Sequence, residues 1–423
     1  MYAMKNPTIW PLSPKPYQLE GFNLAINEEA FAFFGEQGTG KTNMAVAVIA
    51  HRLAQGEIGR ALVVCSKALK PDWEREVAHL ESVDVITYDS IFPEKNTLKK
   101  RKYGMVVLDE SKRIKRRNSQ RSRGVRSLSR SIKFKLILDG TPVTQSPVDL
   151  WAQFNLLKPN LLGKFSSFKD TYCKIGGYLN KQILGFKNLE DLVEVIKPYY
   201  FRVLKEDVLD LPDRHDHIVW ITLSKSSRDL YQRMNRDLEI WVDSHSVSVD
   251  MEATKVMKLR QMVGGMVKGD CGELIPIGVE KAQELRKLLA RIDHKAIIFC
   301  SFRHELEIIQ EVCDYLCQGH VTLSGKVKMN ERDHLLSKFR KDKLTSRLIC
   351  QISVGSEGLN LVEAKSTIYY SPTYSIGHLL QSKDRNHRIG QDTEVHYYYL
   401  LVKDSIDEKI HKKTLNTFTN LLD

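Results

Sequence analysis

Short apolar, strand-like runs alternate with amphipathic, helix-like stretches over most of the 423 residues. In the first half, the expected strands are FAFF (31–34), ALVVC (61–65), VDVIT (83–87), YGMVVLD (103–109) and KLILD (135–139). Helix-like segments such as 41–53 and 71–80 separate them. Strands that alternate with helices in this way form parallel sheets with both faces covered. The first half therefore predicts an α/β lobe built on a parallel sheet.

The same alternation returns near the C-terminus and predicts a second α/β lobe. Its expected strands are KAIIFC (295–300), HVTL (320–323), RLICQI (347–352), STIYY (366–370) and EVHYYYLLV (394–402). Between the lobes the pattern loosens into pieces such as the helix-like SSRDLYQRMNRDLEIWV and the hairpin-like VKGDCGELIPI. We expect a first lobe at 1–160, a helical insertion at 161–210, a linker with a second helical or hairpin insertion at 211–280, and a second lobe at 281–423.

The net charge narrows the class of partner. The 64 Lys and Arg residues against 52 Asp and Glu give a formal charge of +12, which favours a polyanion, either nucleic acid or an acidic membrane surface. No apolar stretch reaches the ~20 residues that span a bilayer, and no signal peptide is evident. We expect a soluble protein of the cytoplasm of a bacterial cell or a phage-infected host, without a membrane partner.

The seven cysteines are scattered and odd in number, which favours free thiols in a reducing compartment. Cys313 and Cys317, four residues apart and followed by His320, lack the second ligand pair of a zinc site. We interpret them as one face of a helix.

Residues 35–42 read GEQGTGKT and match the phosphate-loop pattern G-x-x-x-x-G-K-[ST] between an expected strand and an expected helix. Gly35, Gly38 and Gly40 let the backbone curl so that its N–H groups, with that of Thr39, face phosphate oxygens at a helix N-terminus. Lys41 is expected to reach the β- and γ-phosphates, and the Thr42 hydroxyl to bind Mg²⁺. This pattern predicts a site for ATP.

The sequence LDES (108–111) directly follows four apolar residues of an expected buried strand. Asp109 is expected to hold the Mg²⁺ shell and Glu110 to polarise the attacking water. Acidic pairs are common on surfaces, but this position, downstream of a phosphate loop, favours a nucleotide hydrolase.

At this point the sequence resembles the Swi/Snf-type branch of helicase superfamily two, nearly from end to end. KPYQLEGF (15–22) is similar to the adenine-sensing segment of that family, which implies that Gln18 reads the base. LVVCSKALKPDWERE (62–76), VITYDSI (85–91), RIK (113–115), LDGTP (138–142) and LWAQFNLLKP (150–159) follow in the family order. The resemblance implies two tandem RecA-like lobes joined through a helical and hairpin insertion region.

The second lobe carries the most specific signature. The string Q-x-x-D-R-x-H-R-I-G-Q begins at Gln381, and the resemblance implies that Arg385 and Arg388 face the nucleotide, with Gln381 on the same helix. KAIIFCSFRHELEII (295–309), LSGKVKMNERDHLLSKFR (323–340) and SVGSEGLNLVEA (353–364) resemble the other segments of this lobe. In the family such segments contact nucleic acid, and we carry this role over to Lys67, Ser301, Gly355 and Asn360.

Two positions depart from the family pattern. The acidic-box histidine is Lys112 here, and Asp139 stands in place of the usual hydroxyl residue before Gly140. Both positions belong to the relay of nucleotide state between lobes. We hypothesise that a Lys112–Asp139 pair replaces the missing hydrogen bond.

Positive charge is concentrated in one segment. Residues 112–135 hold eleven Lys or Arg and no Asp or Glu. One interpretation is a solvated helical face without a binding role, but the lack of neighbouring Asp or Glu residues favours a phosphate-contacting surface. Arg116, Arg117, Arg121 and Arg123 are the candidate contacts.

These features predict a DNA-stimulated ATPase that translocates, as a monomer, on duplex, forked or four-way DNA. Resemblance of FKDTYC (168–173), GFKNLEDL (185–192) and FRVLKEDVLDLP (201–212) to small prokaryotic and phage members and fork-remodelling helicases favours branch migration or fork remodelling in repair, recombination or replication. The alternatives are an RNA-remodelling helicase, the motor subunit of a restriction or defence complex, and an adaptor that binds DNA without turnover.

Overall fold

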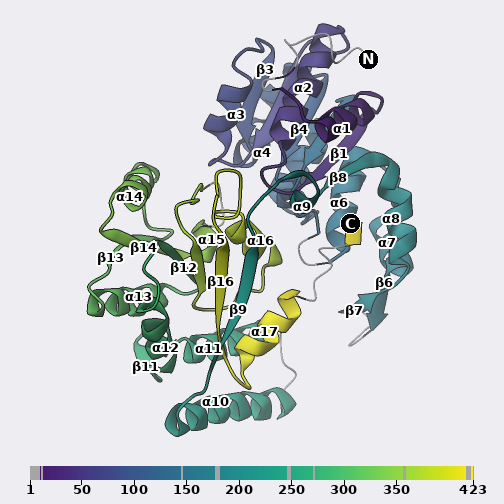
Figure 1. Cartoon of the computed structure of the whole chain (residues 1–423). Coiled ribbons are helices and arrows are strands. Elements are labelled where there is room, and N and C mark those ends of the chain that lie inside the picture. The colour runs from purple at the N-terminus through teal and green to yellow at the C-terminus, as the bar shows by residue number, and fades with distance from the viewer. Residues whose placement is uncertain are drawn as a thin grey trace. The chain divides into compact units, whose positions relative to one another are not determined.

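The computed structural model describes residues 10, 13–143, 146–176, 182–244, 249–269, 272–355, 359–415 and 421–422. The chain divides into two compact units, and each is described here by itself (Figure 1). Unit 1 comprises Met1–Asp210 with Thr417–Asp423, and unit 2 comprises Leu211–Asn416.

Unit 1 is built on a six-stranded sheet in the order β3-β2-β4-β5-β1-β8, with every neighbouring pair parallel. The strands are β1 (Ala30–Gly35), β2 (Ala61–Cys65), β3 (Val83–Thr87), β4 (Met105–Asp109), β5 (Phe134–Leu138) and β8 (Tyr200–Val203). The register pairs Phe33 of β1 with Leu138 of β5, and Leu138 with Asp109 of β4. The strands β1, β4 and β5 therefore end side by side at the same edge of the sheet.

Helices cover both faces of this sheet, because strands such as β1, β2 and β4 carry buried, mainly apolar side chains on both faces. Successive residues such as Phe33 and Phe34 of β1 point to opposite faces and belong to separate buried clusters. The helical segments are α1 (Pro16–Ile26), α2 (Lys41–Ala54), α3 (Lys70–Glu76), α4 (Tyr88–Lys100), η2 (Ser111–Ile114), α5 (Gln120–Ser129), α6 (Val148–Leu157), α7 (Phe165–Tyr172), α8 (Leu189–Ile196), η4 (Lys197–Tyr199) and α9 (Lys205–Val208). A small antiparallel pair, β6 (Cys173–Gly176) and β7 (Gln182–Phe186), follows α7.

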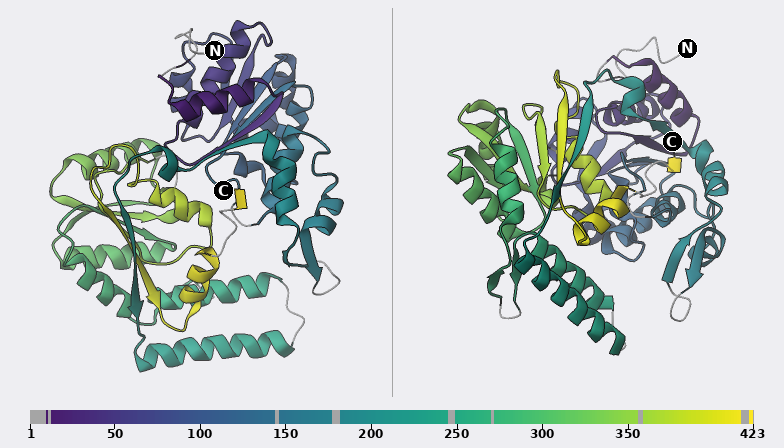
Figure 2. Two further views of the ribbon diagram at one scale, coloured as in Figure 1. Left: turned by 45° about the vertical axis from the view of Figure 1, so that its right-hand side comes forward. Right: turned by 60° about the horizontal axis from the view of Figure 1, so that its bottom comes forward.

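Unit 2 repeats this plan with a second six-stranded parallel sheet, in the order β13-β14-β12-β15-β16-β9 (Figure 2). The strands are β9 (Arg214–Ile221), β12 (Ala296–Cys300), β13 (Gly319–Leu323), β14 (Thr345–Gln351), β15 (Ser366–Tyr369) and β16 (Val395–Val402). Its helices are α10 (Lys225–Ser244), α11 (Val249–Val263), α12 (Glu280–Leu289), α13 (Arg303–Tyr315), α14 (Met329–Lys341), α15 (Ile352–Gly355), α16 (Ile376–Lys383) and α17 (Ile406–Leu415). The hairpin strands β10 (Met266–Lys268) and β11 (Leu274–Pro276) lie between α11 and α12.

A buried ion pair joins two helices of unit 2. The Lys281 ammonium on α12 lies 2.5 Å from the Asp407 carboxylate on α17, and each side chain is 1% exposed. The same carboxylate accepts the Val402 N–H at 3.4 Å. Buried charges are tolerated when they are paired and hydrogen-bonded in this way.

The expected fold class is confirmed: two RecA-like lobes with parallel sheets, and every strand expected from the sequence is present. The expected segment boundaries differ from the structure in two places. The insertion expected at 161–210 also supplies β8, which pairs with β1, and the one expected at 211–280 begins with β9, which pairs with β16. Only the second half of β9, residues 218–221, is apolar, and most of the strand is exposed.

The cysteine interpretation also needs one adjustment. Cys313 is buried on α13, but the helix ends at Tyr315, so Cys317 lies beyond it with a left-handed φ of 52°. Among the described residues, no helix is long and apolar enough to cross a bilayer.

Candidate functional site

The phosphate loop connects β1 to α2 and holds a tightly curled backbone. Gly38 and Gly40 have φ values of 89° and 78°, a left-handed conformation that favours glycine. A Cβ atom at Gly40 would lie 2.1 Å from Nε2 of Gln18, and one at Gly35 would lie 2.5 Å from Oγ1 of Thr39. Both the conformation and the close approaches therefore require glycine in this loop.

Lysine and threonine side chains close the loop on itself. Nζ of Lys41 donates to the carbonyl oxygens of Gly35 at 2.5 Å and Glu36 at 3.1 Å, and Oγ1 of Thr39 donates to the Glu36 carbonyl at 2.8 Å. The 14-residue helix α2 begins at Lys41, so its free N–H groups and positive dipole end face the loop. A glycine-rich curl, a lysine and a helix N-terminus fit a polyphosphate anion.

Helix α1 is tied to the same loop by two side chains. The Gln18 carboxamide is buried, accepts the Lys15 N–H at 2.9 Å and donates to the Thr39 carbonyl at 3.2 Å. The Tyr17 hydroxyl donates to the same Thr39 oxygen at 3.0 Å. Gln18 therefore lies beside the phosphate loop, as a base-reading residue requires. Tyr17 was not predicted, and its only sequence signal is its place next to Gln18.

The acidic pair stands where β4 ends. The buried Asp109 carboxylate accepts the Trp73 indole N–H at 2.8 Å and the Glu110 N–H at 2.8 Å, and the Tyr88 hydroxyl donates to the Asp109 carbonyl at 2.7 Å. Glu110 has φ 55° and ψ 53°, a left-handed conformation that is uncommon for a residue with a side chain. Such local strain is typical of functional sites.

The two carboxylates have opposite pKa shifts. Burial, and next the negative charge of Glu110, raise the pKa of Asp109. Burial would also raise the pKa of Glu110, but the positive charges of Lys112, Lys41 and Arg113 together outweigh it and hold that pKa below its usual range. Glu110 is therefore ionised. A cation bound close to Asp109 would stabilise the ionised form of that carboxylate.

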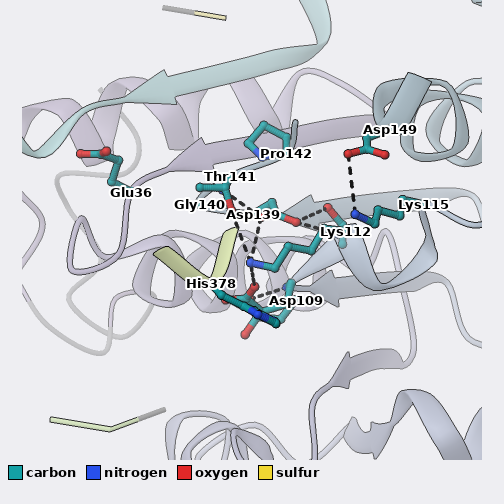
Figure 3. Close-up of polar contacts among 12 residues, drawn as sticks. Glu36, Asp109, Lys112, Lys115, Asp139, Gly140, Thr141, Pro142, Asp149 and His378 are labelled. Atoms are coloured by element: carbon teal, nitrogen blue, oxygen red, sulfur yellow. Dashed lines mark hydrogen bonds and ion pairs between the residues drawn. The ribbon is translucent and has the colours of Figure 1, made fainter. Parts of the chain in front are cut away.

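Asp139 joins the acidic box to the segment that follows β5 (Figure 3). Its carboxylate accepts the backbone N–H of Lys112 at 2.6 Å, the backbone N–H of Thr141 at 2.9 Å and the Ser111 hydroxyl at 3.3 Å. The Lys112 ammonium lies 3.9 Å from the same carboxylate but only 2.7 Å from that of Glu110. The hypothesised Lys112–Asp139 pair therefore exists, with the backbone N–H as its closer link.

A buried glutamine extends this network. Oε1 of Gln153 accepts the Ser111 hydroxyl at 2.6 Å, and Nε2 of Gln153 donates to the Pro142 carbonyl at 2.8 Å. Gln153 lies in the LWAQFNLLKP segment, so the family resemblance marks its region without marking the residue. Neither Ser111 nor Gln153 was among the predicted site residues.

The Thr42 hydroxyl and the Asp109 carboxylate are the candidate protein ligands for a divalent cation. Thr42 is the second residue of α2, and Asp109 follows β4, two strands away from β1 in the sheet. Over the described ranges, no group of three or more His, Cys, Asp or Glu is placed to hold a metal. Mg²⁺ in phosphate sites uses few protein ligands and completes its shell with phosphate and water. The donor set therefore fits Mg²⁺ bound together with a nucleotide.

The signature residues of unit 2 lie around the end of α16. Gln381 is on this helix, but the helix ends at Lys383, so Arg385 and Arg388 follow it in a turn and the expected single helix is wrong. The chain turns because the Arg385 N–H bonds to Ser382 at 3.2 Å instead of continuing the helical ladder. Arg385 is buried, with its guanidinium on the carbonyls of Gln381 at 2.8 Å and Leu359 at 3.0 Å, whereas Arg388 is half-buried.

The basic candidates lie from the end of η2 to α5. Arg116, Arg117 and Arg123 are exposed, and the Arg117 guanidinium lies 4.8 Å from the centre of the Phe165 ring. Arg121 differs, because its Nε is 2.7 Å from the Asp89 carboxylate. That ion pair offsets the charge of Arg121.

The remaining nucleic-acid candidates have different environments. Lys67 and Asn360 are exposed, whereas a Cβ atom at the buried Gly355 would lie 2.5 Å from Sγ of Cys350, so packing alone explains that glycine. The Ser301 N–H donates to Glu305 at 2.9 Å and to Ser371 at 2.8 Å, and Arg260 donates to the Ser301 hydroxyl at 3.0 Å. The three residues after Gly355 in the expected glycine-rich turn lie outside the described residues.

Trp73→Phe tests the hydrogen bond that orients Asp109. We expect a lower rate of Mg²⁺-dependent ATP hydrolysis and a higher Mg²⁺ concentration for half-maximal rate, by about tenfold, because metal-site partners of this kind contribute 10–100-fold. Trp151→Phe is the matched control: it is another buried tryptophan of unit 1, whose indole donates to the Gly163 carbonyl at 3.1 Å. An equal loss in both variants would assign Trp73 to packing alone.

Comparisons with known proteins agree with this arrangement. The SNF2-related domain model matches residues 77–265, and the helicase conserved C-terminal domain model matches residues 280–390. Solved structures with similarity include the Sulfolobus solfataricus SWI2/SNF2 ATPase core in complex with dsDNA, with 23% identity and a TM-score of 0.46 over 99% of this chain and 94% of that one.

Curated relatives are similar over nearly the whole chain. One is the ISWI chromatin-remodeling complex ATPase CHR17 of Arabidopsis thaliana, 25% identical over 94% of this chain and 41% of that protein. Another is the SWI/SNF-related matrix-associated actin-dependent regulator of chromatin subfamily A member 1 of Mus musculus, 28% identical over 83% of this chain and 34% of that protein. The chain thus spans less than half the length of these two relatives. With both domain models matched in succession, the chain belongs to the SNF2 family of helicase-like ATPases.

Proposed function

We propose that this chain hydrolyses ATP with Mg²⁺ and that DNA binding stimulates the hydrolysis. The observation that carries the proposal is the meeting of three motifs at one edge of the unit 1 sheet. The phosphate loop follows β1, the acidic pair ends β4, and the Asp139–Thr141 segment follows β5. Hydrogen bonds through Asp139 tie the second motif to the third.

The residues of unit 1 divide the chemistry among them. The loop N–H groups and Lys41 would bind the phosphates, and Thr42 and Asp109 would hold Mg²⁺, whose charge makes the γ-phosphoryl group more susceptible to attack. Glu110 accepts the proton of the attacking water, since it is ionised and stands next to Asp109. Gln18 selects the base from its position beside the loop.

Residues of unit 2 complete the proposed chemistry. Arg388 is half-buried in a turn, and we assign it the role of neutralising charge on the γ-phosphoryl group. Arg385 donates to backbone carbonyls within its own unit, so we assign it and Gln381 to the positioning of that turn.

Glu110→Gln and Lys41→Ala test the hydrolysis. We expect Glu110→Gln to bind ATP but to lose at least about 10²-fold in turnover, because the phosphate contacts stay while the base is removed. Lys41→Ala is expected to lose hydrolysis together with ATP affinity. Fluorescent-nucleotide binding and steady-state ATPase assays separate the two effects. Parent-like turnover in Glu110→Gln would disprove the assignment of the catalytic carboxylate.

We propose that the chain binds DNA through the exposed arginines that follow η2. Residues 112–135 hold eleven basic residues and no acid, and among them Arg116, Arg117 and Arg123 are exposed where a backbone of phosphates could contact them. By name, one relative is a chromatin-remodeling complex ATPase and another is a regulator of chromatin, which supports the proposal. We propose that the chain acts on DNA as a monomer, with Lys67, Ser301 and Asn360 as further contacts.

Neutralising Arg116, Arg117, Arg121 and Arg123 to Gln tests this surface. Because Asp89 already pairs with Arg121, we expect the loss of about three phosphate contacts, which would flatten the log–log salt slope of duplex binding by about 2.7. Fluorescence anisotropy against salt concentration measures the slope. Arg121→Gln alone is the control and is expected to change the slope by less than one. An unchanged slope in the folded quadruple variant would favour a solvated face.

More specifically, we propose that the chain remodels DNA junctions, by branch migration or fork regression. At a junction each base pair broken is replaced by one formed, so the net pairing energy is near zero. Opening a plain duplex lacks this compensation and costs ~1.4 kcal/mol per step. The fork-remodeller-like segments of the sequence favour the first process.

Labelled four-way junctions beside linear duplexes of equal length test this proposal. With ATP and Mg²⁺ we expect migration of the junction and little separation of the linear duplex. A matched RNA duplex belongs in the same assay, because an RNA-remodelling helicase is the alternative. Efficient opening of linear DNA or RNA without action on junctions would refute junction remodelling.

A further inference from the structure

The Lys112 side chain contacts both Glu110, the proposed general base, and the segment after β5. Figure 3 shows Lys112 beside Asp139 and Thr141. The Lys112 ammonium nitrogen is 2.7 Å from the Glu110 carboxylate, 3.3 Å from the Thr141 hydroxyl and 3.9 Å from the Asp139 carboxylate. The Lys112 and Glu110 side chains are only 16% and 15% exposed. This pairing is a departure from the family pattern, in which a histidine occupies the position.

We propose that Lys112 restrains Glu110 in the DNA-free protein and releases it when DNA binds, so that the lysine is a positioning residue that sets the basal rate. The inference rests on the proposed ATP hydrolysis and deepens it. It assigns a regulatory contact to one side chain of the site.

The first step of the argument is competition for the Glu110 carboxylate. A general base must accept a hydrogen bond from the water that it deprotonates. The Lys112 ammonium is a charged donor at 2.7 Å from one of the two carboxylate oxygens, and charge-assisted bonds of this kind are among the stronger ones. While it is in place, it competes with water for that oxygen and fixes the direction of the carboxylate.

The second step is that the released ammonium has another partner within reach. Asp139 and Thr141, two residues of one segment, lie 3.9 and 3.3 Å from the same nitrogen. A lysine side chain has several rotatable bonds, so a small rotation that shortens the 3.9 Å separation would lengthen the contact with Glu110. The Lys112 backbone N–H stays bonded to Asp139 in either arrangement, because it does not depend on the side-chain rotamer.

The third step connects this choice to DNA. Lys112 is the second residue of the short helix η2, which ends at Ile114, and Arg116 and Arg117 come after one intervening residue, Lys115. A phosphate contact at these exposed arginines acts on the backbone that carries Lys112. We expect the resulting shift of η2 to move the ammonium from Glu110 toward Asp139.

Lys112→Gln in the full chain is the principal test. A hydrogen bond to a charged group is worth enough to change a rate by about tenfold. We expect the DNA-free kcat to rise by about tenfold with little change in KM for ATP. The DNA-saturated kcat should change by less than about twofold. The ratio of stimulated to basal rate therefore falls. Lys112→Arg keeps the charge and is expected to restore a low basal rate.

Lys158→Gln is the matched control. Lys158 also belongs to unit 1 and pairs with a glutamate, Glu28, at 3.1 Å, and it has no part in the proposed site. Its removal should leave both rates unchanged, which separates the restraint from a general effect of losing a paired lysine.

Asp139→Asn is a second, independent test, in which a rate is expected to fall and not to rise. The Thr141 N–H bonds to one oxygen of Asp139 and the Lys112 N–H to the other, so the amide keeps one of these bonds and loses the charge that would receive the ammonium. We expect a lower DNA-saturated kcat, since Lys112 then stays on Glu110. This measurement keeps the inference falsifiable if Lys112→Gln unfolds, which thermal denaturation would reveal.

A basal rate that is unchanged or lower in folded Lys112→Gln, with the parent active, would overturn this inference alone. So would an undiminished DNA-saturated rate in folded Asp139→Asn. A parent that hydrolyses ATP no faster than Lys41→Ala would instead overturn the proposed function and the inference with it.

Discussion

The site of unit 1 depends on the parallel order of three strands, β4, β5 and β1. Parallel strands point their carboxyl ends to the same edge, and the register pairs Asp109 and Phe33 with the same residue, Leu138. A one-residue slip would turn every side chain of a strand to the opposite face, and both faces of this sheet are packed in buried clusters. The packing of the sheet therefore fixes where the phosphate loop, the acidic pair and the Asp139 segment meet.

Asp139 shows how a departure from a family pattern can be accommodated. A buried carboxylate is costly unless its oxygens are hydrogen-bonded. Here the backbone N–H groups of Lys112 and Thr141 each bond to one of its oxygens, so the acidic box and the segment after β5 are joined through one residue. The Lys112 ammonium lies closer to the Glu110 carboxylate, at 2.7 Å, than to that of Asp139, at 3.9 Å. The two departures from the family pattern are therefore linked to each other and to Glu110.

The arginine signature of unit 2 was predicted by resemblance, and its local structure explains a division of labour that resemblance did not supply. The buried guanidinium of Arg385 satisfies the carbonyls of Gln381 and Leu359, which stabilises the turn beyond α16. Arg388 is left more accessible in that turn. The two arginines of one motif therefore have different environments in this unit.

The sequence by itself determined the strands, the phosphate loop and the acidic pair, because each depends on local patterns: apolar runs, glycines that adopt positive φ, and carboxylates at a strand end. It did not predict the strands β6, β7, β8 and β9, of which β9 is mostly exposed and apolar only in its second half. It also missed Trp73, Ser111 and Gln153 as members of the site. Only the tertiary structure decided these. Trp73 is 36 residues from Asp109 and Gln153 is 42 residues from Ser111, and only the folding of the sheet brings such side chains within hydrogen-bonding distance.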